Sequence, residues 1–318
     1  MQKIISCDWG TSTLRLRLVE TDRQIVLAEV TCNQGIFDTY KLWQQQGYEE
    51  QRRLSFYQSV IQNEIKKLES QFKSPLQQVP IIISGMASST IGMVELPYKQ
   101  LPCSIDGNEF EIKILKADDE FPYEAVVISG VKTENDVMRG EETQLIGCDV
   151  DEGEHIFIFP GTHSKHVFIN HKKILNLKTY MTGEFFTLLS TQSILSTAIA
   201  NDHRSIAPSS FKSFEAGVVS SLQSSLLHNS FLVRTNQLFN TYTKEENYYY
   251  LSGLLIGAEL KELQGADAKI TIVGDELMMK LYNTALQQLG ISKVKNINAV
   301  QAVIHGHCKI YKIAQTFR

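Results

Sequence analysis

Two short glycine turns, each set between strand-like runs, constrain the fold of this 318-residue chain more than any other feature. The first turn is GTST at residues 10–13, and the second is PGTHSK at residues 160–165. Each joins the first two runs of a three-stranded meander, so the second half of the chain repeats the plan of the first. The strand-like runs are 4–7, 14–20 and 25–31 in the first half and 155–159, 166–170 and 174–180 in the second.

Each meander is followed by helices and by apolar strands that end in glycine. Runs 80–85, 125–130 and 269–274 have the continuous apolar character of buried parallel strands. We therefore predict an α/β protein of two domains, 1–147 and 148–318, whose matching turns face each other across a cleft. Helices are predicted over 43–72, where apolar residues recur at helical spacing, and over 185–200, 216–227 and 248–263. A further predicted helix ends near 289.

Composition argues against several classes of protein. The formal net charge of −4 speaks against a nucleic-acid or polybasic membrane role, and no apolar run approaches the roughly 18 residues that span a bilayer. The first residues read as a strand and not as a targeting segment. The five cysteines are odd in number and form no CxxC pair, which is typical of reduced thiols. We expect a soluble cytoplasmic protein.

The first glycine turn has the residues of a phosphate site. Gly10 lets the backbone approach a ligand, and Thr11 and Ser12 add hydroxyl and N–H donors that suit phosphate oxygens. Asp8 would repel bare phosphate, so a Mg²⁺ ion between the two is the chemistry that explains it. The alternative, a hairpin turn in which Asp8 caps backbone N–H groups, stays open on these residues alone.

The second turn, PGTHSKHV, strengthens the phosphate interpretation. Gly161, Thr162 and Ser164 repeat the small-residue cradle, and Lys165 adds a positive charge. The spacing is not that of a Walker A loop, so it does not predict a P-loop NTPase. His163 with His166, and the segment 305–308 (HGHC), could hold a metal. Structural roles are the better interpretation, the second at a strand or helix boundary, because no further ligand is close in sequence.

A cluster of acids and one arginine follows the buried run 125–130. The segment 133–147 is predicted to begin a helix there, with Thr133 and Asp136 as a capping box. The ends of such strands are where α/β sheets place ligand chemistry. A carboxylate in this segment could take the proton of an attacking hydroxyl, and Arg139 could hold a substrate carboxylate. The acids concerned are Asp136, Glu141 and Glu142.

Small residues further along could border a nucleotide. Gly253 and Gly257 on a predicted helix, with Gly274 after a strand, make room for a flat ring, although close helix packing explains the first two equally well. In the first half, the loop 84–90 ends a predicted strand and is a candidate sugar-side loop.

With these residues assembled, the chain resembles the sugar-kinase, Hsp70 and actin superfamily. CDWGTSTLRLRL resembles its first phosphate motif, FPGTHSKHVFI its second, and SGLLIGAEL with TIVGD its adenosine region. Within it, the segments DVMRGEETQLIG, PGTHSKHV, MTGEFF, GMASSTIG and LSGLLIGAEL resemble the 2-dehydro-3-deoxygalactonokinase family. The resemblance implies two ribonuclease-H-like domains flanking a nucleotide cleft. It also implies ATP, Mg²⁺ and phosphoryl transfer to the 6-hydroxyl of 2-dehydro-3-deoxy-D-galactonate.

The resemblance also implies roles for individual residues. Asp136 is the first choice of catalytic base, Glu141 the second, and Arg139 the partner of the substrate carboxylate. Asp8 is expected to hold the metal. Closure of the two domains about residues 147–153 is expected to exclude water from the site. The residues expected to bind nucleotide are Asp8, Gly10, Thr11, Ser12, Gly161, Thr162, Ser164, Lys165, Gly253, Gly257 and Gly274. Those expected to bind the sugar acid are Arg15, Gly85, Met86, Ser89, Arg139 and Glu142.

Two positions depart from the family pattern, and several alternatives stay open. Asp275 stands where related kinases carry a small residue, and Val303 where the family carries glycine, so both could reshape the nucleotide pocket. The sequence also permits a kinase for a related 2-keto-3-deoxy sugar acid, an actin- or Hsp70-like ATPase switch, a phosphohydrolase or a sugar-acid sensor. A homodimer is one option for its assembly.

Overall fold

The computed structural model describes residues 2–200 and 208–316, which form two compact units. The first unit contains residues 1–152, 169–177 and 299–318, and the second contains 153–168 and 178–298. The main division falls between residues 152 and 153, and residues 299–318, at the end of the chain, return to the first unit.

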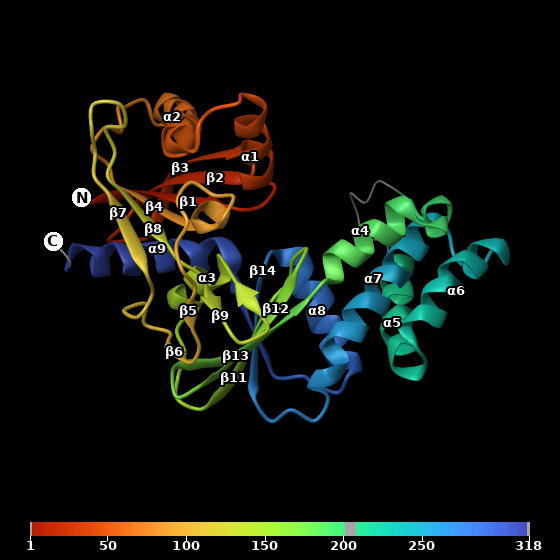
Figure 1. Ribbon diagram of the computed structural model, residues 1–318. Coiled ribbons are helices and arrows are strands. Elements are labelled where there is room, and N and C mark those ends of the chain that lie inside the picture. The colour runs from red at the N-terminus through yellow and green to blue at the C-terminus, as the bar shows by residue number, and fades with distance from the viewer. Residues whose placement is uncertain (1, 201–207, 317–318) are drawn as a thin grey trace. The chain divides into compact units, whose positions relative to one another are not determined.

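The first unit is built on a six-stranded sheet of order β3-β2-β1-β4-β8-β7 (Figure 1). The predicted meander is antiparallel, β4 lies parallel to β1, and β8 lies parallel to β4. Fully buried Ile, Leu and Val side chains on both faces form its core. The strands are β1 (Lys3–Trp9), β2 (Leu14–Glu20), β3 (Ile25–Cys32), β4 (Ile81–Gly85), β7 (Ile112–Leu115) and β8 (Ala125–Ile128).

The long helix expected over 43–72 is two helices, α1 (Ile36–Gln45) and α2 (Arg53–Phe72), with a short 3-10 turn, η1 (Glu50–Arg52), between them. Gly47 ends the first helix, since its φ of 64° lies in the left-handed region that a helix cannot continue through. The predicted apolar face of the second helix is confirmed, because Tyr57, Ile61 and Ile65 are fully buried.

The acidic segment does not begin a helix at Thr133. A small sheet of order β10-β9-β5 comes first, made of β5 (Lys99–Gln100), β9 (Val131–Lys132) and β10 (Val137–Met138), and the helix α3 (Glu141–Gly147) follows. The bond from the Asp136 N–H to Thr133 Oγ1, at 2.9 Å, is the one a capping box would make, but here it closes a hairpin turn. The hydrogen bond expected between Thr133 and Asp136 is therefore present, but it lies in a hairpin and not at the start of a helix.

The helix α9 (Ala299–Gln315) was not predicted. It packs against α3, β1 and β4 of the first unit (Figure 1). A Cβ built on Gly306 would lie 1.9 Å from the carbonyl oxygen of Thr143, so the two helices cross in backbone contact. The segment 305–308, expected at an element boundary, lies inside α9, where His307 and Cys308 are buried.

The sheet associated with the second unit has the order β15-β14-β11-β12-β13-β6. The predicted meander and the parallel strand are confirmed, and β15 was missed. The division between the units passes through β12 and β13, whose far ends belong to the first unit, where β13 pairs with β6. The strands are β11 (Glu154–Phe159), β12 (Ser164–Asn170), β13 (Lys173–Tyr180), β14 (Lys269–Gly274), β15 (Val294–Asn298) and β6 (Cys103–Ser104).

Helices make up the rest of the second unit. The helix expected over 216–227 is the end of α5 and the start of α6, separated at Ser225, whose side chain caps the second helix. The expected helix 185–200 ends earlier, in the 3-10 turn η3 (Ile194–Ala198). The elements are α4 (Thr182–Gln192), α5 (Pro208–Gln223), α6 (Leu226–Leu238), α7 (Lys244–Leu260), η4 (Lys261–Leu263) and α8 (Glu276–Gln288). Among the described residues, no helix combines the length and apolarity that a bilayer span needs.

Candidate active site

The first glycine turn is fastened to the start of α1. The carbonyl oxygens of Gly10 and Thr11 accept the N–H groups of Ile36 and Phe37, at 3.0 and 3.2 Å. Gly35 makes this close approach possible, because a Cβ there would lie 2.2 Å from the Thr11 carbonyl oxygen. The turn's carbonyls are thus turned toward the helix, and the side chains of Thr11 and Ser12 are exposed. An exposed turn with its carbonyls tied back can offer donors to an anion.

Asp8 lies next to the turn at the end of β1, with its side chain 24% exposed. Its Oδ2 pairs with Nη1 of Arg15, the residue opposite it on β2, at 3.3 Å. A partly exposed carboxylate beside a turn that can offer donors to an anion fits a hydrated Mg²⁺ that keeps most of its waters. Arg15 would compete with such an ion for the same oxygen.

Two glycines bring the ends of β1 and β4 against the start of α3. Gly85 (φ 87°) pairs with Trp9, and a Cβ on it would lie 2.6 Å from the Trp9 carbonyl oxygen. Gly140 (φ 117°) comes so near that its Cβ would lie 3.3 Å from the Cα of Gly85. Only glycine tolerates both the backbone angles and the contact. Glu141, the first residue of α3, therefore begins beside the strand ends that carry Asp8.

Glu142 has a different setting from the other acids, because its side chain is fully buried. Its two carboxyl oxygens both accept the N–H of Gly140, at 2.8 and 2.7 Å. Burial, and secondarily the charge of Glu141, raise the pKa of Glu142 to about 8. Glu142 thus supports the Gly140 bend from behind, and the structure gives it no exposed face toward a sugar.

Arg139 is held by the loop that follows β4. Its Nη1 donates to the carbonyl oxygen of Ser88 at 2.7 Å and to Ser88 Oγ, and its guanidinium lies 4.0 Å from the ring centre of Tyr98. Ser88 Oγ in turn donates to the Ile128 carbonyl oxygen at the end of β8, at 2.6 Å. Sequence reasoning selected Gly85, Met86 and Ser89 from this loop and missed Ser88, since nothing in the run of small residues distinguishes it.

Ser89 and Met86, which were also chosen from this loop, have structural contacts within the first unit. Ser89 is buried and donates to the carbonyl oxygen of Met86 at 2.7 Å, which closes the 3-10 turn η2 (Met86–Ser88). Met86 is half-buried and packs against the apolar core of the first unit.

Asp136 lies in the β9–β10 hairpin and not at the start of a helix. Its Oδ1 accepts the N–H of Val137 at 2.7 Å, and its carbonyl oxygen accepts the N–H of Thr133 at 2.9 Å. The sequence favours Asp136 as the base because it predicts this residue at the start of a helix that follows a buried strand. In the structure that place belongs to Glu141.

The second glycine turn is exposed and is braced by α4. No heavy atom lies within 4 Å of a Cβ built on Gly161, whereas one on Gly183 would lie 2.7 Å from the Gly161 carbonyl oxygen. The Thr162 carbonyl oxygen accepts the N–H of Glu184 at 3.0 Å, and the side chains of Glu184 and His163 are 2.5 Å apart. This turn, like the first, has its carbonyls directed at a helix N-terminus.

Ser164 and Lys165 differ from expectation in their exposure. Ser164 is fully buried and donates to Glu259 at 2.7 Å, so its hydroxyl is committed inside the unit. Lys165 is 7% exposed, and its Nζ donates to the carbonyl oxygen of His163 at 3.1 Å, within the turn. Over the described ranges, no group of three or more His, Cys, Asp or Glu side chains could hold a metal ion.

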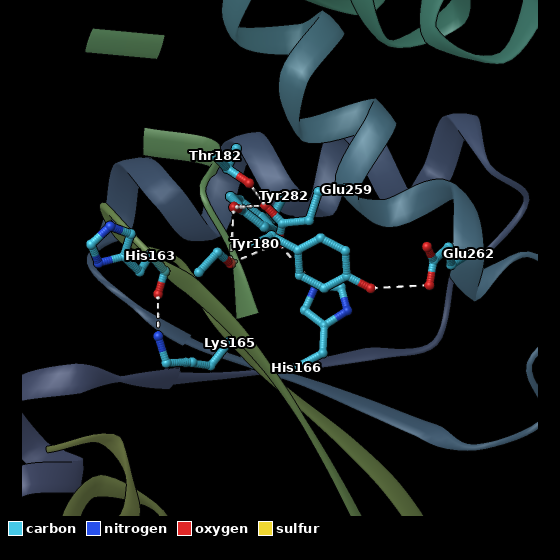
Figure 2. A network of polar contacts seen from close by, with 9 residues as sticks. His163, Lys165, His166, Tyr180, Thr182, Glu259, Glu262 and Tyr282 are labelled. Carbon is cyan, nitrogen blue, oxygen red and sulfur yellow. Dashed lines mark hydrogen bonds and ion pairs between the residues drawn. The ribbon is translucent and has the colours of Figure 1, made fainter. Parts of the chain in front are cut away.

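Glu259 is the residue of this region that sequence reasoning missed. Its carboxylate lies at the centre of a buried network that includes His166, Thr182 and Tyr282 (Figure 2). An acid near the end of an apolar helix, in LLIGAEL, was the available signal. Beside it, a pocket of about 460 Å³, open space included, is lined by Tyr180, Met181, Thr182, Phe185, Leu226, Leu255, Ala258 and Glu259.

The glycines proposed for the adenosine region have structural explanations in two of three cases. A Cβ on Gly253 would lie 2.0 Å from the Phe214 carbonyl oxygen, and one on Gly257 2.4 Å from Ser221 Oγ. The contact between α5 and α7 therefore leaves no slot for a ring at these positions. Gly274 has ordinary surroundings, with its nearest neighbour 3.6 Å away, and a nucleotide role there stays a prediction.

The two departures from the family pattern also have local explanations. Asp275 caps α8, since its Oδ1 accepts the N–H of Met278 at 2.8 Å. Val303 is buried in α9, in the first unit, and does not belong to the unit that carries Gly274.

The meanders, the parallel strands beside them and the glycine turns at strand ends define an α/β fold with mixed sheets. A family model described as 2-keto-3-deoxy-galactonokinase matches residues 8–310, from the metal-site candidate Asp8 to α9. The chain belongs to that family, and it is an enzyme that phosphorylates a sugar.

Individual relatives agree with the family match. The chain is 30% identical over 313 residues to a protein of Rhizobium meliloti (strain 1021) named "Probable 2-dehydro-3-deoxygalactonokinase", covering 94% of this chain and 93% of that one. It is also 30% identical to the 2-dehydro-3-deoxygalactonokinase of Escherichia coli (strain K12), over 72% and 78% of the two chains. A crystal structure from Sinorhizobium meliloti, assigned to the same kinase, has a TM-score of 0.80 at 27% identity, covering 98% and 96%.

Proposed function

We propose that the protein is an ATP-dependent kinase that phosphorylates 2-dehydro-3-deoxy-D-galactonate at its 6-hydroxyl. Family membership supports the reaction class. The observation that carries the proposal further is the contact between Gly85 and Gly140, because it gathers Asp8, Arg139 and Glu141 near one end of one sheet. A metal-binding acid, a proton acceptor and a cation for the substrate carboxylate are the groups this transfer needs.

Glu141 is the base in this proposal, and Asp136 is not. The backbone of Glu141 follows Gly140, which lies against Gly85 at the end of β4, whereas Asp136 is tied into the β9–β10 hairpin. Glu141 would accept the proton of the sugar hydroxyl as that oxygen attacks the terminal phosphorus atom of ATP.

Arg139 is the proposed partner of the sugar acid's carboxylate. The stack on Tyr98 and the bonds to Ser88 fix the plane of its guanidinium, and a fixed plane favours two parallel bonds to a carboxylate. This requirement for a carboxylate would exclude simple hexoses.

The exposed turns at Gly10 and Gly161 are the proposed phosphate-binding elements, with Thr11, Ser12 and Thr162 as donors. Asp8 would hold Mg²⁺, which supplies charge neutralisation to the phosphate oxygens when bound. Both turns have their carbonyls drawn toward helices, which favours N–H donors on the ligand side.

The test is a coupled ADP-release assay on 2-keto-3-deoxy-galactonate, 2-keto-3-deoxy-gluconate and simple hexoses, with the phosphorylated carbon of the product identified by NMR. We expect turnover with the galactonate derivative and a phosphate on carbon 6. Turnover with hexoses alone would contradict the proposal, and so would a phosphate at another carbon. ADP release that ignores every sugar acid would instead favour an ATPase switch or a phosphohydrolase.

The base is tested separately. Glu141→Gln should lower kcat by about 10²-fold or more, the usual contribution of a general base, while Asp136→Asn keeps most of it. The reverse result would return the role to Asp136.

A further inference from the structure

The buried carboxylate of Glu259 has no part in the reaction outlined above. It is the second-last residue of α7 and is 3% exposed. A carboxylate without water around it is costly unless donors surround it. What those donors are, and where they come from in the chain, indicates what this side chain does.

Four side chains contact the two oxygens of Glu259. Figure 2 labels three of them, His166, Thr182 and Tyr282. Oε1 accepts Ser164 Oγ at 2.7 Å and lies 2.9 Å from His166 Nε2. Oε2 accepts the hydroxyl of Tyr282 at 2.8 Å and that of Thr182. Each oxygen therefore meets two groups, whereas in a glutamine side chain one of the two positions would be an NH₂ group, which cannot accept.

Two of these partners border the second glycine turn. Ser164 is the first residue of β12, immediately after the turn, and Thr182 is the first residue of α4. The next residues of α4, Gly183 and Glu184, are the ones that touch the turn's backbone. Glu259 thus links the strand that leaves the turn to the helix that braces it.

We propose that Glu259 is a positioning residue that holds the turn 161–163 in the form that binds nucleotide phosphates. The proposal rests on the phosphate role given to this turn under the proposed function. A purely stabilising role is the weaker explanation, because replacing a buried ionic network by apolar groups is often neutral for stability. The placement of its partners on both sides of the turn is what a positioning role requires.

Thr182 offers the sharpest test, because it can be changed without disturbing the packing. Thr182→Val keeps the shape and removes the hydroxyl, whereas Thr182→Ser keeps the hydroxyl. Binding would be measured by titration calorimetry with a non-hydrolysable ATP analogue plus Mg²⁺ and, separately, with adenosine. Thr191→Val, at an exposed threonine of the last turn of α4, is the matched control.

We expect Thr182→Val to weaken binding of the ATP analogue about tenfold and to leave adenosine binding unchanged, with Thr182→Ser and Thr191→Val close to the parent. Glu259→Gln should give a larger loss with the same selectivity. Equal losses for both ligands, or none for either, would overturn the proposal. If the parent protein binds no ATP analogue, the proposed function itself fails, which is a distinguishable result.

Discussion

The ring nitrogen Nε2 of His307 lies 2.9 Å from the hydroxyl oxygen of Ser84, on β4. The other ring nitrogen, Nδ1, lies 2.7 Å from the hydroxyl oxygen of Ser6, on β1, so one side chain near the end of the chain contacts two strands of the first half. The histidine is fully buried in α9. Burial, and then the charge of Arg17, lower its pKa to about 3, so the folded protein keeps this ring neutral.

His307 should make the protein sensitive to acid. The unfolded chain takes up a proton below a pH of about 6.5 and the folded chain does so only near 3, so stability is lost as the pH falls through that window. His307→Gln should lower the free energy of unfolding at neutral pH by about 1–3 kcal/mol and flatten its loss in acid. Urea unfolding at several pH values measures both. His228→Gln, at an exposed histidine, should leave the curve unchanged.

Glu142 should have the opposite effect to His307 on how the free energy of unfolding changes with pH. Its pKa is raised to about 8 in the folded protein, whereas the unfolded chain loses this proton near pH 4.5. Stability therefore falls as the pH rises between these values, by at most about 1.4 kcal/mol per pH unit. Glu142→Gln keeps an acceptor for the Gly140 N–H and carries no titrating proton. Its unfolding free energy should be flatter across this range, and parallel curves for parent and variant would contradict the assignment.

The contact between α3 and α9 should tolerate no side chain. Gly306→Ala would put a methyl group 1.9 Å from the Thr143 carbonyl oxygen, so the helices must separate, at a cost of about 3 kcal/mol or more. Gly265→Ala is the control: its φ is 78° with nothing within 4 Å, and strain alone should cost about 1 kcal/mol. Thermal unfolding that ranks the two variants equally would contradict the contact.

Ser88 should matter for the sugar acid through Arg139. Ser88→Ala removes the hydroxyl that Arg139 and the Ile128 carbonyl oxygen share, so the guanidinium gains freedom. We expect KM for the sugar acid to rise about tenfold while KM for ATP stays near the parent value. Steady-state kinetics with each substrate varied in turn measures this, with Thr90→Ala, an exposed neighbour, as the control. A rise in both constants would indicate a general distortion of the loop.

Much of the fold could be predicted because its signals are local. Alternating apolar residues and glycine turns are properties of short segments, and both meanders were found from them. The start of α3 could not be predicted, because the Thr133–Asp136 pattern suits a helix cap and a hairpin turn alike, and pairing with β5 decides between them. The helix α9 was missed because the roles of Gly306 and His307 depend on distant parts of the chain. Gly306 allows close contact with α3, and the ring of His307 contacts Ser84 on β4.

The same limit applied to the site. Asp8, Gly85 and Glu141 were chosen because they follow strand ends, which a sequence marks. Ser88 and Glu259 were missed because their importance lies in hydrogen bonds to residues 40 and 95 positions away.

The place of α9 has a consequence for how the chain is made. The strands β1 and β4 and the helix α3 have been synthesised long before residues 299–315, yet α9 is what covers them. During translation, the apolar face that α9 covers in the first unit therefore stays exposed until residues 299–315 have been made. The second unit ends at residue 298, so all of its residues are synthesised before α9. Nascent chains halted before residue 299 should bind chaperones through that face, and release should follow the emergence of α9.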